Sequence, residues 1–181
     1  MTPDNTDAIN TAEILNAKLR DGNNRVHAFL NTLQALDIQR EDEQIMEHLD
    51  NSLDALLNAV NASLGSLLVL DEESAQLVYV LVNGTQSNPQ MAWQRISADT
   101  GVSGGVLRHG EAAIVNEASA DERLDISSDI PEGLSAETLM CIPMTGQDRT
   151  LGVITFINKR VDGMFTDDDK TLALLMGRFA G

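Results

Sequence analysis

Residues 151–159 read Leu-Gly-Val-Ile-Thr-Phe-Ile-Asn-Lys, and a short loop then leads to Phe165 and Asp169. The first seven positions carry mostly apolar side chains on both faces, which is typical of a strand that is covered on both sides. Thr166 stands where a helix N-cap belongs, before a helix that is predicted over 167–179. Three aspartates in its first turn suit the positive end of the helix dipole. The stretch therefore predicts a central strand followed by a capped helix.

Asn158, Lys159, Phe165 and Asp169 have the spacing of an Asn-Lys, Phe, Asp-Glu signature. With this spacing the chain resembles the GAF family, the sensory domains of cyclic-nucleotide phosphodiesterases, adenylate cyclases and a bacterial transcription activator. The resemblance implies that these four residues support the lid of a pocket, with Lys159 and Asp169 paired across the loop, and do not grip a ligand. Lys170 replaces the final Glu, and phosphodiesterase-type nucleotide binding is usually associated with the complete signature.

The order of further segments extends the resemblance over about residues 42–179. Residues 66–70 and 77–82 are apolar runs joined by a polar turn, which predicts a β-hairpin. Residues 101–117 resemble the glycine-rich start of the family's short helix, followed by its short strand. Residues 139–144 resemble its penultimate strand. Each motif is weak alone, and their shared order carries the resemblance.

These segments predict an α/β (α+β) fold of the GAF/PAS-like type, with a mainly antiparallel sheet of about five to six strands flanked by helices. Residues 93–96 are expected to add a strand. A long amphipathic helix is expected from about Asp42 to a stop at Gly65. Residues 1–41 are expected to form an N-terminal helical leader, and residues 42–181 the GAF domain. The leader either packs across a two-fold axis, as the resemblance implies, or folds back on its own domain.

Composition limits the partners. The net charge of −16 over 181 residues repels phosphate backbones and anionic lipids, so neither nucleic acid nor membrane is an expected partner. No apolar run approaches the about eighteen residues that span a bilayer, and no secretory signal is recognisable. The single cysteine permits no internal disulfide. We therefore expect a cytoplasmic location.

Catalytic patterns are not found, and we expect no enzymatic activity. His27, His48 and His109 are isolated in sequence, and none has a nucleophile or a metal cluster beside it. Cys141 lies in an apolar strand and is interpreted as a small buried hydrophobe. One branch of the resembled family reduces oxidised methionine, but it requires several cysteines.

The resemblance implies a pocket between the sheet and a covering segment, residues 91–138. An amide-rich helix start at residues 103–105 would face a cyclic phosphate, with Thr138 or Asp121 reading the base. For each candidate side chain, loop capping or solvent exposure is the alternative. The candidate ligand contacts are Trp93, Arg95, Ser103, Gly104, Asn116, Asp121, Arg123 and Thr138.

The sequence thus predicts a bacterial-type sensory domain, homodimeric and non-catalytic, that binds a small molecule of unknown identity. Occupancy would shift the arrangement of the terminal helices. An output module such as a kinase, cyclase or phosphodiesterase would follow residue 181 or act in trans. The alternative is a ligand-free interaction module, with a pocket filled by its own side chains and helices that serve only to dimerise.

Overall fold

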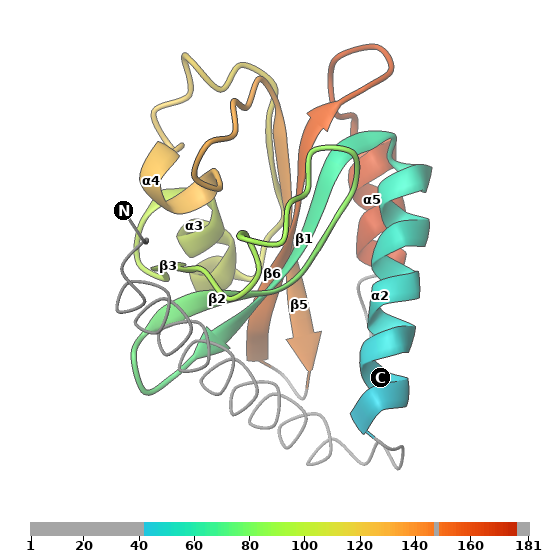
Figure 1. The fold of residues 1–181 in the computed structure, drawn as a ribbon. Coiled ribbons are helices and arrows are strands. Elements are labelled where there is room, and N and C mark those ends of the chain that lie inside the picture. Colours follow the sequence, from blue (N-terminus) through green and yellow to red (C-terminus); the bar gives the residue numbers. More distant parts are fainter. Residues whose placement is uncertain (1–41, 147–148, 177–181) are drawn as a thin grey trace, which may run out of the picture. The chain divides into compact units, whose positions relative to one another are not determined.

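The computed structural model of this chain describes residues 42–146 and 149–176 (Figure 1). The helical stripes expected in residues 1–41 lie outside these residues, as do His27 and the turn at 147–148. The chain divides into two compact units, residues 1–42 and 43–181, and the sheet with its helices belongs to the second.

The centre of the domain is a six-stranded antiparallel sheet in the order β3-β2-β1-β6-β5-β4. Its strands are β1 (Ala62–Asp71), β2 (Gln76–Asn83), β3 (Arg95–Ser97), β4 (Ala113–Val115), β5 (Leu139–Gly146) and β6 (Arg149–Lys159). The strand β6 lies between β1 and β5, as the apolar residues on both of its faces predict. The predicted fold class is therefore confirmed.

Helices cover both faces of this sheet (Figure 1). One face carries α2 (Asp42–Ala59) and α5 (Asp167–Met176), and the other carries α3 (Gly101–His109) and the short α4 (Ile126–Asp129). We call the second one the α3 face. Its buried apolar cluster joins Leu68, Cys141 and Val153 of the sheet to Val102 and Val106 of α3. Within the described residues, no helix combines the length and the apolar character needed to cross a membrane.

The helix α2 buries one side against the opposite sheet face. Leu49, Leu53, Leu56 and Leu57 are at most 4% exposed, and their spacing places them on one side of a helix. Gly65 of β1 faces this helix, since a Cβ there would lie 3.3 Å from a methyl carbon of Leu57. The amphipathic pattern is thus explained by packing on the sheet.

The predicted end of this helix was wrong. The helix ends at Ala59 and β1 begins at Ala62, whereas the sequence pattern placed the stop at Gly65. Asn61 adopts a φ of 53°, in the left-handed region, and so ends the helix. Leu64 fits the apolar period of a helix and also that of a strand, and it pairs with Ile157 of β6.

The third strand also begins later than predicted. It covers Arg95–Ser97, whereas the expectation was residues 93–96. Trp93 has a φ of 69°, which no regular strand contains. Its amide still donates to the Tyr79 carbonyl at 2.8 Å, so the segment remains attached to β2.

Candidate functional site

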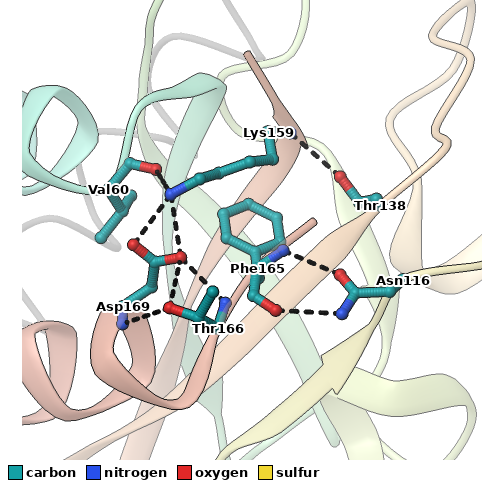
Figure 2. A network of polar contacts seen from close by, with 7 residues as sticks. All are labelled: Val60, Asn116, Thr138, Lys159, Phe165, Thr166 and Asp169. Carbon is teal, nitrogen blue, oxygen red and sulfur yellow. Dashed lines mark hydrogen bonds and ion pairs between the residues drawn. The ribbon is translucent and has the colours of Figure 1, made fainter. Parts of the chain in front are cut away.

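Lys159, at the end of β6, connects the sheet to α2 and α5, the two helices on the face opposite α3 (Figure 2). Its Nζ lies 2.8 Å from each carboxylate oxygen of Asp169 in α5 and donates to the Val60 carbonyl after α2, also at 2.8 Å. The Lys159 and Asp169 side chains are only 9% and 13% exposed. The ammonium also lies 5.7 Å from the centroid of the Phe165 ring. The ion pair that the resemblance implied is therefore present.

Thr166 caps α5 as predicted. Its hydroxyl accepts from the Asp169 amide at 3.2 Å, and the Asp169 carboxylate accepts from the Thr166 amide at 2.9 Å. Burial works to raise the pKa of Asp169, but hydrogen bonds from Lys159 and Thr166 outweigh it, so the pKa is lowered. The carboxylate is thus held in its charged form.

Asn116, which follows β4, holds the loop before α5 (Figure 2). Its Oδ1 accepts from the Phe165 amide at 2.8 Å, and its Nδ2 donates to the Phe165 carbonyl at 3.0 Å. Asn116 was expected among the ligand contacts. Both ends of its side-chain amide are thus engaged by the backbone of Phe165.

Asn158 holds the covering segment on the α3 face. Its Oδ1 accepts from the Glu137 amide at 2.8 Å, and its Nδ2 donates to the Ser135 carbonyl at 2.8 Å and to the Gln86 side chain at 3.0 Å. Its φ is 58°, so the regular strand geometry ends here. Two consecutive residues of β6 therefore bind different layers: Asn158 binds the covering loops, and Lys159 binds the helices.

Four other expected ligand contacts are already engaged within the protein. Arg95 donates to Asp71 at 2.7 Å, to Gln76 at 2.9 Å and to Ser74 at 2.8 Å, at the β1–β2 hairpin. Asp121 and Arg123 pair with each other at 2.6 Å, and the Arg123 side chain is 59% exposed. The hydrogen bond from Arg123 lowers the pKa of Asp121. Thr138 accepts from the Lys159 amide at 3.0 Å (Figure 2).

The remaining expected ligand contacts, Trp93, Gly104 and Ser103, differ in how far they are buried. Trp93 is half-buried beside β2. Gly104 is buried, and a Cβ there would lie 2.8 Å from the Ala98 carbonyl oxygen, so glycine permits α3 to pack closely on residues 98–99. Ser103 is fully buried. His48 and His109 are exposed.

The start of α3 is occupied by a carboxylate of the protein itself. Asp129 accepts from the amides of Val102 and Ser103 at 2.8 Å each, and from the Asp125 amide at 3.0 Å. These amides are the ones that a helix leaves free for an anion. The hypothesis that residues 103–105 face a cyclic phosphate is therefore corrected, because Asp129 fills the helix start.

Three buried hydroxyls on the α3 face have no hydrogen-bond partner within the described part of the chain: Ser66 Oγ, Ser103 Oγ and Thr155 Oγ1. Ser66 of β1 pairs with Thr155 of β6, which pairs in turn with Cys141 of β5. Ser103 lies on α3, whose apolar residues share a buried cluster with Cys141. Buried polar groups in proteins are usually paired, so these three hydroxyls are exceptions among the described residues.

Cys141, which pairs with Thr155 across β5 and β6, is fully buried, as interpreted from the sequence. Burial raises the pKa of its thiol and the negative charge of Asp129 acts in the same direction, while the nearby Ser103 hydroxyl acts weakly against them. The thiolate is therefore disfavoured. Among the residues described, no three His, Cys, Asp or Glu side chains are arranged to hold a metal ion.

Sequence reasoning missed Ser66, Thr155 and Asp129. The first two have a detectable signal, since each is a polar residue inside an otherwise apolar strand, and such a residue is buried by its neighbours. Asp129 has none, because it follows two serines in a segment that resembles an ordinary loop.

Comparison with known proteins shows the family of this chain. The GAF domain family matches residues 42–181. The chain belongs to the GAF family. A probable 3',5'-cyclic phosphodiesterase of Caenorhabditis elegans is 25% identical over 130 residues, which are 67% of this chain. The matched region spans only 18% of that relative.

Solved structures share the GAF fold. The GAF domain of an Acinetobacter phosphoenolpyruvate-protein phosphotransferase superposes with a TM-score of 0.64 at 17% identity, covering 88% of each chain. A free methionine-R-sulfoxide reductase of Neisseria meningitidis superposes with a TM-score of 0.59 at 18% identity, covering 74% of this chain and 73% of its own. At such identities the likeness concerns the fold alone.

Proposed function

We propose that this GAF domain is a non-catalytic sensor that binds a small molecule between the sheet and α3. The observation that carries the proposal is the group of three buried, unpartnered hydroxyls, Ser66, Ser103 and Thr155. Leaving a polar group buried without a partner costs about 1–3 kcal/mol. A ligand with matching polar groups would recover much of that free energy on binding.

The end of β6 supplies a route from this pocket to the helices. Asn158 binds the loops that border the α3 face, and Lys159 binds the end of α2 and the start of α5. A ligand that favours one arrangement of the loops would bias the adjoining Lys159 contacts and so the helices. In this proposal the chain is a cytoplasmic homodimer whose helices pass the signal to an output module.

The relatives support a regulatory role. The C. elegans relative is named a cyclic phosphodiesterase, and its match to this chain covers a small share of its length. A reductase activity like that of the N. meningitidis structure is disfavoured, because the sequence holds one cysteine and that cysteine is buried. The proposal therefore assigns the chain no reaction of its own.

The alternative, a ligand-free interaction module, is favoured by different observations. The helix start that would hold a phosphate is filled by Asp129, and several expected ligand contacts bind the protein itself. Leu172 and Leu175 of α5 are 38% and 70% exposed, as a helix that packs against a second protein would require. Thr155→Val tests the sensor alone, since a ligand-free module has no ligand binding to weaken.

The first experiment is native mass spectrometry of the purified protein, which reports the number of subunits and any retained small molecule. Ligand binding is then followed by the emission of Trp93, the single tryptophan. A sensor predicts that Thr155→Val weakens binding of the identified ligand roughly tenfold while the empty protein stays as stable or becomes more so. A clean dimer, with no ligand found in a metabolite screen, would support the interaction module.

A further inference from the structure

The carboxylate of Asp129 occupies the start of α3, and it bears on which ligands the proposed pocket would take. Asp129 is 0% exposed and accepts three backbone hydrogen bonds, two of them from the start of α3. An anion at a helix start is stabilised by free amides and by the helix dipole. In this protein the Asp129 carboxylate already accepts from those amides.

The backbone around Asp129 is shaped to keep the carboxylate in place. Gly101 has a φ of 70°, and a Cβ at this position would collide with both carboxylate oxygens of Asp129. A phosphate or carboxylate ligand at the start of α3 would therefore have to displace Asp129 or lie against its charge. Either course costs free energy, since a buried carboxylate without its donors is unfavourable.

Within the described part of the chain, no cation balances the charge of Asp129. Among residues 42–146 and 149–176, no lysine, arginine or histidine lies within ion-pair distance of it. The field of Asp129 reaches the sheet, because it adds to the effect of burial in raising the pKa of both Tyr79 and Cys141. A carboxylate offers about four acceptor positions, so one remains free beside three accepted bonds. The α3 face thus has a negative charge and unpaired hydroxyls.

We infer that Asp129 determines ligand specificity: the pocket takes a small molecule with an ammonium group at its α3 end and excludes those with a phosphate or carboxylate there. The ammonium donates to the free acceptor position of Asp129. The hydroxyls of Ser66, Ser103 and Thr155 bind the remaining polar groups of the ligand. This inference rests on the proposed function, since it assumes that a ligand enters between the sheet and α3.

Anion exclusion is tested without knowledge of the ligand. Inorganic phosphate is titrated while NMR follows the amide signals of Val102 and Ser103. We expect no shift in the wild type and a saturable shift in Asp129→Ala, because the amides are then uncovered. The exposed Glu122 gives the control Glu122→Gln, which removes the same charge and should behave as the wild type. Shifts in the wild type equal to those in the variant, or none in a folded Asp129→Ala, would overturn the inference.

Ammonium preference is tested on the wild type alone, so it does not depend on whether a variant folds. Two sets of compounds are compared by Trp93 emission, and within each set the head group is an ammonium, a hydroxyl or a carboxylate. The first set is tyramine, tyrosol and hydroxyphenylacetate. The second is ethanolamine, ethylene glycol and glycolate. The ammonium member should bind roughly tenfold to a hundredfold more tightly than the carboxylate member. Equal or tighter binding of the carboxylates, or of cyclic AMP or cyclic GMP, would refute the inference and leave the sensor proposal standing. Absence of binding by all these probes, together with no ligand in the native mass spectrum, would refute both.

Discussion

Gly101 and Gly105 of α3 differ in what an added side chain would meet. Gly101 has a φ of 70° and faces the Asp129 carboxylate, so an added Cβ would disturb both the backbone and the buried anion. Gly105 lies in the same helix, and a Cβ there would meet nothing within 4 Å. The glycine-rich run therefore combines a required glycine with a replaceable one.

Gly101→Ala should destabilise the protein by about 2–3 kcal/mol, because strain adds to the loss of hydrogen bonds at Asp129. Gly105→Ala should instead stabilise it by about 0.5–1 kcal/mol through helix propensity. Chemical denaturation of both variants measures the difference. Equal effects of the two substitutions would show that Asp129 is not held as described.

Asp169 makes the stability of the domain depend on acid. Hydrogen bonds from Lys159 and Thr166 outweigh the burial that raises its pKa, and the folded-state pKa lies below the ordinary value of an aspartate. A carboxyl group with a depressed pKa stabilises the fold above its unfolded pKa, and this contribution is lost as the pH falls through the folded pKa. The affected range is therefore the acid range below about pH 5.

Asp169→Asn should lower the free energy of unfolding by about 2 kcal/mol at pH 7, since Lys159 loses its anionic partner and keeps only the Val60 carbonyl. The difference from the wild type should shrink as the pH falls through the lowered folded-state pKa, where Asp169 becomes protonated in the folded protein as well. Denaturation curves at several pH values measure this. Asp168→Asn is the control, because Asp168 is exposed beside it. A difference that stays constant with pH would contradict the role of the charge.

At the scale of elements, the end of β6 joins segments that the sequence separates widely. Through Asn158 it binds the loop after β2 and the segment before β5, and through Lys159 it binds the regions of α2 and α5. A rigid central strand can transmit a displacement from one layer to another because its own hydrogen bonds on both edges hold it in place.

Asn158→Gly removes the three side-chain hydrogen bonds, and glycine adopts the φ of 58° at this position without strain. We expect faster hydrogen exchange around Gln86 and in the segment 135–137, with β1 and β6 largely unchanged. Asp162→Gly is the matched control, since exposed Asp162 also has a positive φ, of 61°. Unchanged exchange in the two loops would rule out Asn158 as their anchor.

For the whole molecule, the chain divides near residue 42 into two compact units, and the buried residues that the structure describes lie in the second. The buried cluster of the α3 face and the leucines of α2 all lie within residues 43–181. A domain of this size can bury enough apolar surface to fold by itself.

A fragment of residues 42–181 should therefore unfold cooperatively, with a near-ultraviolet circular dichroism spectrum like that of the full chain. Comparing the molar masses of the fragment and the full chain in solution tests the expected dimerisation segment. A dimeric full chain with a monomeric fragment would assign dimerisation to residues 1–41. A fragment without cooperative unfolding would contradict the proposed domain boundary.

The sequence by itself determined the central strand, the capped helix after it and the family, because these depend on short-range spacing. The alternation of residues 151–157 predicted a strand with two covered faces, and the spacing of Lys159 and Asp169 indicated their ion pair. The end of α2 was misplaced because Leu64 fits two periods, and only its pairing with Ile157 decided between them.

The tertiary structure alone decided which polar groups lie together on the α3 face. Asp129 reaches the start of α3 from 27 residues away, and Asn116 reaches Phe165 across 49 residues. Ser66 and Thr155 lie side by side only because β1 and β6 pair in one register. Local patterns specify which face a residue occupies, whereas the path of the chain specifies what it meets there. For this reason the Lys159–Asp169 ion pair was found from the sequence, and the carboxylate that fills the helix start was not.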